Sequence, residues 1–127
     1  MKSKEKGDIA VAKAISYYMQ AGYEVLLPIG DKRPYDLVIE NTQGNLIKVQ
    51  CKYTSHKSDY GIYQVPLRVM GGNRSYNTAK SYDKKDFDIL FAYTSDKNIY
   101  AIPFKDITAK NSISLGELYS KFKIMEN

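Results

Sequence analysis

Three polar side chains carry most of the chemistry in this sequence: Asp36, Gln50 and Lys52. Gln50 and Lys52 are two residues apart in a segment with strand character, so both leave the sheet on the same face. Carboxylate and amide oxygens are hard ligands that suit Mg²⁺. A lysine beside such an ion can orient or deprotonate a water and stabilise charge on a phosphate. The set is compatible with metal-assisted phosphodiester hydrolysis, and also with a solvated, purely structural strand face.

The segments around these residues predict a β-hairpin. Residues 35–40 form the first strand, residues 41–45 supply Asn and Gly for the turn, and residues 46–54 form the second strand. Pairing of the two strands can bring Asp36 next to Gln50 and Lys52. The apolar face of the second strand is expected to pack on a helix and the polar face to meet water. Those faces are Ile47, Val49, Cys51 and Tyr53 on one side, and Lys48, Gln50 and Lys52 on the other.

The remaining segments predict one mixed sheet. A helix is expected over residues 6–21, with Asp8 as a cap or first-turn acid and Gly22 as its stop. Strands are expected at 23–27, 62–70, 87–93 and 98–104, a polar loop at 71–81, a helical turn at 105–108 and a helix at 115–122. We therefore predict an α/β fold, a mixed β-sheet flanked by helices, in a single domain of residues 1–127. The predicted apolar stripe of the first helix is Val11, Ala14, Ile15, Tyr18 and Met19.

Composition narrows the function classes. The 127 residues contain one cysteine, Cys51, and one histidine, His56, which excludes an intramolecular disulfide and a zinc site built from several thiolates. The net charge of +5 is compatible with a nucleic-acid partner and also with a lysine-rich soluble surface. No apolar stretch approaches the roughly 20 residues needed to span a bilayer, and residues 1–8 do not resemble a secretion signal, so we expect a cytoplasmic protein.

Several basic and aromatic residues are candidates for DNA contact. Lys32 and Arg33 precede Asp36 closely and could bind phosphate, or form a solvated turn. The long polar loop at 71–81 is a plausible binding segment, since long loops on a rigid scaffold often carry recognition. The DNA-binding candidates are Lys32, Arg33, Lys57, Arg74, Tyr76 and Lys80.

Two short motifs carry a resemblance to a known family. Pro34-Tyr35-Asp36 followed by Gln50-Cys51-Lys52 resembles the PD-(D/E)XK nuclease motif, with a tyrosine inserted and glutamine in place of the second acid. The similarity extends over roughly residues 6–109, toward a small branch that includes intron-encoded homing endonucleases and archaeal-type Holliday junction resolvases. Its flanking segments are Lys6-Gly7-Asp8-Ile9, Gly22-Tyr23-Glu24-Val25, Pro28-Ile29-Gly30-Asp31, Asp86-Phe87-Asp88 and Tyr100-Ala101-Ile102-Pro103.

The resemblance implies a restriction-endonuclease-like fold and assigns roles to the motif residues. Asp36 would be the central metal ligand, Gln50 a weaker ligand through its side-chain oxygen, and Lys52 the group at the attacking water. The branch usually carries a glutamate in the first helix, and Val11 stands at that position here. Asp8 or Glu5 could replace the missing acid; the alternative for Asp8 is a helix-terminus acid.

The leading functional expectation is a metal-dependent DNA endonuclease of homing or restriction type. It would use Mg²⁺, with Mn²⁺ as a substitute, and act on double-stranded DNA as a homodimer or tetramer, because cutting both strands calls for two active sites. One alternative is a non-catalytic DNA-binding module that keeps the nuclease fold without the acid at Val11. A second alternative is a Holliday junction resolvase.

Overall fold

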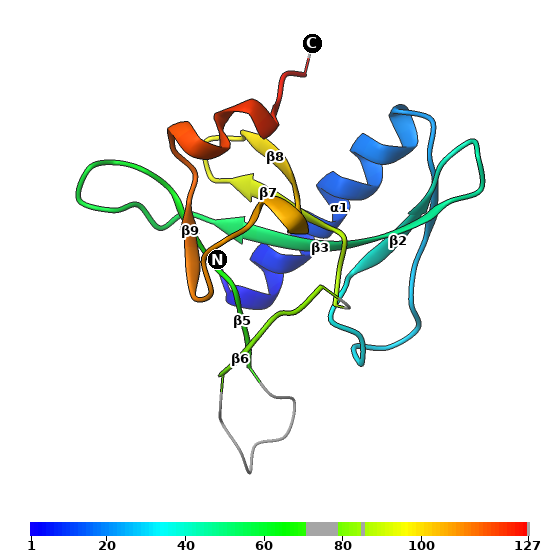
Figure 1. Ribbon diagram of the computed structural model, residues 1–127, viewed down its shortest axis with the longest axis horizontal. Helices are drawn as coiled ribbons and strands as arrows, with labels where there is room; N and C mark the ends of the chain where they lie inside the picture. The colour runs from blue at the N-terminus through cyan, green and yellow to red at the C-terminus, as the bar shows by residue number, and fades with distance from the viewer. Residues whose placement is uncertain (71–78, 85, 127) are drawn as a thin grey trace.

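The computed structural model describes residues 1–70, 79–84 and 86–126, and for residues 68–70 and 79–81 it describes the backbone alone. Figure 1 shows a single long helix lying against a twisted sheet, with short strands and 3₁₀ turns packed around the other side. In chain order the elements are α1 (Ser3–Gln20), β1 (Glu24–Leu26), β2 (Leu37–Glu40), β3 (Leu46–Thr54), β4 (Gln64–Pro66), β5 (Arg68–Met70), β6 (Ala79–Ser81), β7 (Ile89–Thr94), β8 (Ile99–Pro103), η1 (Phe104–Asp106), β9 (Ser112–Ser114), η2 (Glu117–Phe122) and β10 (Lys123–Ile124).

The central sheet has six strands in the order β1-β2-β3-β7-β8-β10. It is mixed, because β3 and β7 run parallel while the other neighbouring pairs are antiparallel. The predicted hairpin is confirmed. Its second strand has the predicted bounds, and its turn is closed by the Asn41 side chain, whose oxygen accepts hydrogen bonds from the backbone N–H groups of Gln43 and Asn45 at 3.0 and 2.9 Å.

Helix α1 covers one face of this sheet. It begins three residues earlier than predicted, after Lys2, so Asp8 lies in the second turn and does not cap the helix. Its end is a Schellman motif: Gly22 has a φ of 97°, its N–H donates to Met19 O, and the Tyr23 N–H donates to Tyr18 O. The prediction of Gly22 as the stop is therefore confirmed.

The buried side of α1 differs in part from the predicted stripe. Met19 is 61% exposed, so its placement on the apolar stripe was wrong, and Ala10, which was not predicted, is fully buried. The small Ala10 and Ala14 let the helix approach the sheet closely, and Tyr18 fills the space toward Phe91. This helix-facing cluster consists of Ala10, Ala14, Tyr18, Leu37, Ile39, Val49, Cys51, Phe91 and Ile99.

A second apolar cluster covers the opposite face of β7 and β8. Leu90 and Ala92 alternate with Phe91 along β7, so this strand is buried on both sides. The cover comes from β4, β9 and the 3₁₀ helix η2, and with α1 on the other face the predicted mixed sheet flanked by helices is confirmed. The cluster consists of Val65, Leu67, Phe87, Leu90, Ala92, Tyr100, Ile102, Ile113, Leu115 and Tyr119.

Three further expectations are corrected by the structure. The predicted strand over 62–70 is divided at Leu67, because β4 ends at Pro66, pairing with β9, whereas β5 pairs with β6. The predicted loop over 71–81 ends in strand β6, and residues 71–78 lie outside the described part of the chain. The predicted helix over 115–122 is a six-residue 3₁₀ helix, a form suited to such short segments. Across the described ranges, no helix has the length and apolar character needed to cross a bilayer.

Candidate active site

The candidate site lies where strand β3 extends beyond the end of its neighbour β2. The two strands pair from Glu40 opposite Leu46 to Leu37 opposite Val49, and β2 begins there. On its other edge β3 continues to pair with β7 as far as Thr54. The edge of β3 that faces β2 therefore becomes open from residue 50 onward, and the side chains just before β2 reach this open edge.

Asp36 occupies the first position beyond the paired region. Its backbone N–H donates to Val49 O at 2.8 Å, and its side-chain Oδ2 accepts a hydrogen bond from the backbone N–H of Cys51 at 2.8 Å. The carboxylate thus takes the place of the missing strand partner and is fixed against β3. Burial raises the pKa of Asp36, the Cys51 N–H and the charge of Lys52 oppose that rise, and the charge of Asp31 adds to it.

Gln50 and Lys52 flank this contact on β3. The Gln50 side-chain nitrogen donates to Cys51 O at 3.3 Å, which leaves its amide oxygen as the metal-binding group. The Lys52 Nζ lies 5.4 Å from the centre of the Tyr82 ring. Burial lowers the pKa of Lys52, and the nearby Asp36 carboxylate partly opposes this. A lysine with a lowered pKa beside a carboxylate is typical of catalytic sites, although ion pairs in structural networks show similar shifts.

These side chains line one open cleft of about 470 Å³. The first turns of α1 form its opposite wall. Asp8 and Val11 both line it, and Asp8 also forms an exposed ion pair with Lys4, with Nζ and Oδ1 3.7 Å apart. Glu5 does not line this cleft. The lining residues are Ser3, Lys4, Lys6, Gly7, Asp8, Val11, Asp36, Gln50, Cys51, Lys52, Tyr53 and Pro66.

The donor set of the cleft suits a hard divalent cation held mainly by water. Asp36 offers a carboxylate and Gln50 an amide oxygen, and Mg²⁺ is commonly bound by one or two carboxylates while keeping several waters. Among the residues that the structure describes, no group of three or more His, Cys, Asp or Glu side chains is placed to hold a metal. A soft or fully protein-coordinated ion such as structural zinc does not fit this set.

The polar face of β3 is partly exposed, and two of its lysines lie beside tyrosine rings. Lys48 Nζ lies 5.8 Å from the centre of the Tyr35 ring, as Lys52 Nζ lies over Tyr82. Both lysines are half-buried, and Lys52 lines the open cleft together with Gln50, in keeping with the expectation that this face meets water. Each ammonium group lies near a tyrosine ring, a common arrangement for a lysine at the border of an apolar cluster. The opposite, apolar face of β3 is buried as predicted, and Cys51 is 5% exposed.

Tyr82 is a site residue that the sequence analysis missed. It follows β6 and comes thirty residues after Lys52, so no local periodicity links the two. Burial raises the pKa of its hydroxyl, and the charges of Asp36 and then Asp86 add to the rise. The hydroxyl is therefore close enough to the Asp36 carboxylate to be affected by its charge.

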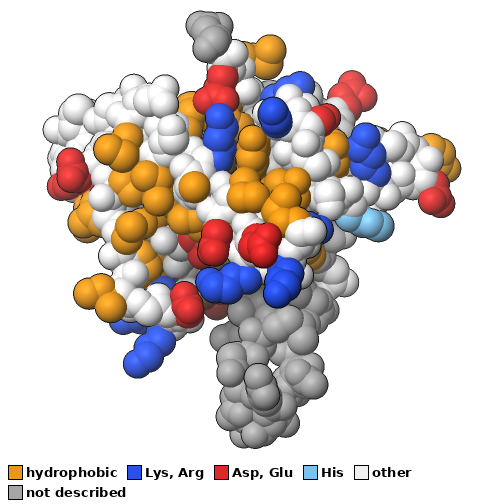
Figure 2. Space-filling view, turned by 180° about the vertical axis from the view of Figure 1, so that it is seen from behind, with side chains coloured by type: hydrophobic (Ala, Val, Ile, Leu, Met, Phe, Trp, Pro, Cys, Tyr) orange, Lys and Arg blue, Asp and Glu red, His pale blue; other side chains and the backbone are white. Residues whose placement is uncertain are grey.

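Of the DNA-binding candidates whose side chains the structure describes, Lys32, Arg33 and Lys57, none lines the cleft. Lys32 and Arg33 are exposed in the loop that leads to Asp36, and Lys57 is exposed with its Nζ 4.8 Å from the centre of the Tyr63 ring. Arg74 and Tyr76 lie outside the described residues, and only the backbone of Lys80 is described, in β6. On the described part of the face in Figure 2, basic and acidic side chains are interspersed and form no continuous field of one sign.

The comparisons with known proteins agree with this architecture. A family model described as PD-(D/E)XK endonuclease matches residues 1–123. Among solved structures, the bacterial homing endonuclease I-Ssp6803I is similar, with 35% sequence identity, a TM-score of 0.79, and coverage of 92% of this chain and 80% of that protein. The comparison with curated proteins finds no match. Members of the matched family generally use divalent metal ions, in keeping with the donors in the cleft. On the family match over nearly its whole length, the chain belongs to the PD-(D/E)XK endonuclease family.

Proposed function

We propose that this protein is a Mg²⁺-dependent DNA endonuclease whose active site is the cleft at the open edge of β3. The proposal rests on one observation: Asp36, Gln50 and Lys52 line the same cleft in a chain that belongs to an endonuclease family. Asp36 and Gln50 would hold the metal, and Asp8, which lines the opposite wall, would add a carboxylate through a bound water.

The protein's own residues would orient the metal ligand, activate the attacking water and stabilise charge on the phosphate. When bound, the metal would supply Lewis-acid activation of the phosphate and of the attacking water. The Cys51 N–H fixes the orientation of Asp36, so the carboxylate needs little rearrangement before it binds an ion. Lys52, half-buried near that carboxylate, would orient the water and take its proton or, when charged, stabilise the negative charge that develops on the phosphate.

Binding of double-stranded DNA would depend on basic residues around the cleft. Lys4 and Lys6 line the cleft itself, while Lys32 and Arg33 lie on the approach to Asp36. These side chains would contact phosphates and position the duplex without reading its sequence. A homodimer or tetramer would place two such clefts on the two strands of a target.

The proposal is tested by incubating supercoiled plasmid with Mg²⁺ and measuring nicked and linear products. Wild-type protein should cut, and Lys52→Ala should lose at least about a hundredfold in rate, the lower range for removal of a general acid–base group. Lys48→Ala is the matched control, because Lys48 is on the same strand and face and its ammonium also lies over a tyrosine ring. Equal rates for wild-type protein and Lys52→Ala would refute the proposed site.

A non-catalytic DNA-binding module is the second candidate, favoured by one observation. Val11 lines the cleft at the position where the resemblance places a glutamate, so one carboxylate is missing from the wall of α1. A module of this kind would bind duplex DNA in a salt-sensitive manner and leave the plasmid intact at every Mg²⁺ concentration. Cleavage that disappears in Lys52→Ala excludes it.

A further inference from the structure

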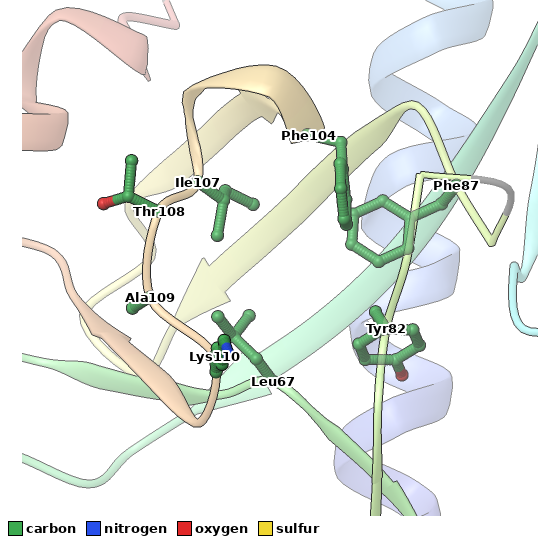
Figure 3. Close-up of a pocket in the computed structure, with 8 residues that line it drawn as sticks. All are labelled: Leu67, Tyr82, Phe87, Phe104, Ile107, Thr108, Ala109 and Lys110. Atoms are coloured by element: carbon green, nitrogen blue, oxygen red, sulfur yellow. The ribbon is translucent and has the colours of Figure 1, made fainter.

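A row of aromatic rings lines a pocket beside the sheet and ends next to the candidate catalytic lysine. The Phe104 and Phe87 rings are 5.1 Å apart with an interplanar angle of 81°, and the Phe87 and Tyr82 rings are 5.0 Å apart at 77°. Both contacts are edge-to-face, a favourable geometry for aromatic pairs. In Figure 3 the three rings form one side of a pocket of about 170 Å³, with Leu67, Ile107 and Ala109 among the residues opposite.

The row is rigid at its centre. Phe87 is 1% exposed and belongs to the buried cluster on the β7–β8 face, with Tyr82 and Phe104 packed against that cluster. A ring that is held edge-on by a fully buried neighbour has little freedom to rotate or shift. The Tyr82 ring is therefore restricted by its contact with Phe87 and the core.

Lys52 meets the outer end of this row. Its Nζ lies 5.4 Å from the Tyr82 ring centre, within the range of a cation–π contact. Among the described residues, the Lys52 ammonium forms no ion pair and no hydrogen bond with another side chain, so its fixed neighbours are the Tyr82 ring and the Asp36 carboxylate, whose charge acts on it. A lysine side chain has four rotatable bonds and loses much entropy when it is held in one position.

We infer that Tyr82 is a positioning residue for Lys52, and that its aromatic ring, anchored by Phe87, holds the ammonium group toward the Asp36 end of the cleft. This inference rests on the proposed function and adds to it a residue outside the Asp36, Gln50 and Lys52 set. The ring, and not the hydroxyl, makes the contact, so Phe should replace Tyr82 and an aliphatic residue should not.

The test uses Tyr82→Phe, Tyr82→Leu and a matched control, Phe104→Leu. The control removes a ring from the other end of the same row and leaves the contact with Lys52 in place. Plasmid nicking is measured under single-turnover conditions with saturating protein and Mg²⁺, affinity for a random duplex is measured in EDTA, and melting temperature is measured for every variant.

We expect Tyr82→Leu to lower the cleavage rate by about tenfold without changing DNA affinity, since a cation–π contact of this kind corresponds to about one factor of ten. Tyr82→Phe should cut at the wild-type rate. Phe104→Leu should lower the melting temperature by an amount similar to that of Tyr82→Leu and keep the wild-type cleavage rate. Equal cleavage by Tyr82→Leu and Phe104→Leu would overturn the inference, as would a loss in Tyr82→Phe as large as that in Tyr82→Leu.

A second measurement does not depend on cleavage. In the NMR spectrum the side-chain Hε signal of Lys52, identified by its loss in Lys52→Ala, should be shifted upfield by the ring. The shift should be kept in Tyr82→Phe and Phe104→Leu and abolished in Tyr82→Leu. An unshifted signal in wild-type protein refutes the inference even if cleavage is normal. Absence of cleavage with a shifted signal refutes the proposed function and leaves the positioning contact established.

Discussion

Replacing Val11 by glutamate would restore the acid that the resemblance places in the first helix. Val11 lines the cleft together with Asp36 and Gln50, and it also packs at the edge of the helix-facing cluster. A glutamate at this position can therefore extend from the wall of α1 toward the ligands on the opposite side. We expect Val11→Glu to bind Mg²⁺ more tightly and, without metal, to unfold more easily.

The size of both effects follows from this placement. A carboxylate about 5 Å from a divalent cation gains about 1.7 kcal/mol even at a dielectric constant of about 80, which is about 17-fold in Kd. Full burial of a valine side chain contributes about 1.5–3 kcal/mol. Val11 is only partly buried, so losing its apolar contacts should cost about 1 kcal/mol of unfolding free energy. For a chain of 127 residues this is a decrease of about 3–4 °C in melting temperature.

Isothermal calorimetry with Mg²⁺ measures the affinity, and thermal unfolding in EDTA and in Mg²⁺ measures the stability. Ile15→Glu is the control, because Ile15 lies one turn further along α1, packs against the same cluster and does not line the cleft. That variant should lose stability without any gain in affinity. If Val11→Glu also lowers the melting temperature and leaves the Mg²⁺ Kd unchanged, position 11 does not reach the metal and the reasoning is refuted.

Three further predictions concern single contacts. Burial raises the pKa of Asp36, so the protonated carboxyl stabilises the folded state at low pH and this stabilisation is lost as pH rises above the ordinary Asp range. Asp36→Asn in EDTA should therefore have a higher melting temperature than wild-type protein at pH 7, and the same melting temperature near pH 3. The buried Tyr18 hydroxyl has no hydrogen-bond partner among the described residues, so Tyr18→Phe should stabilise the fold by about 1 kcal/mol in urea unfolding, and a loss of stability would show that the hydroxyl is satisfied. Removing Lys32 and Arg33 together should reduce the slope of log affinity against log salt by about 2 for all duplexes, and an unchanged slope would place phosphate binding elsewhere.

The hairpin could be predicted because the residues that specify its strands and its turn are close together in the sequence. Strict alternation along residues 46–54 predicted β3, and Asn and Gly at the turn predicted its pairing with the preceding strand; the exact register came from the structure. Asp36 could then be placed beside Gln50 and Lys52 from the sequence alone. The structure confirms that proximity through the hydrogen bond from the Cys51 N–H to the Asp36 carboxylate.

The environment of these residues could not be predicted, because it is built by distant segments. Tyr82 reaches Lys52 from thirty positions later in the chain, and no spacing rule connects a loop tyrosine to a strand lysine. The exposure of Met19 could not be predicted either. Helical periodicity gives the direction in which a side chain points, but whether that side chain is buried depends on how far the sheet extends beneath the helix. The 3₁₀ form of residues 117–122 also depends on tertiary packing, since Tyr119 anchors that short segment in the second cluster.

The central claim is that Asp36 and Gln50 bind one divalent cation beside Lys52, and crystals grown with Mn²⁺ test it most directly. Anomalous diffraction locates the ion without reference to activity. We expect one strong peak within roughly 2.0–2.4 Å of an Asp36 carboxylate oxygen and of the Gln50 amide oxygen, with waters completing its coordination. The peak should be absent in crystals of Asp36→Asn. A wild-type structure in which Mn²⁺ is bound elsewhere, while Asp36 contacts only Lys52 and the Cys51 N–H, would contradict the account.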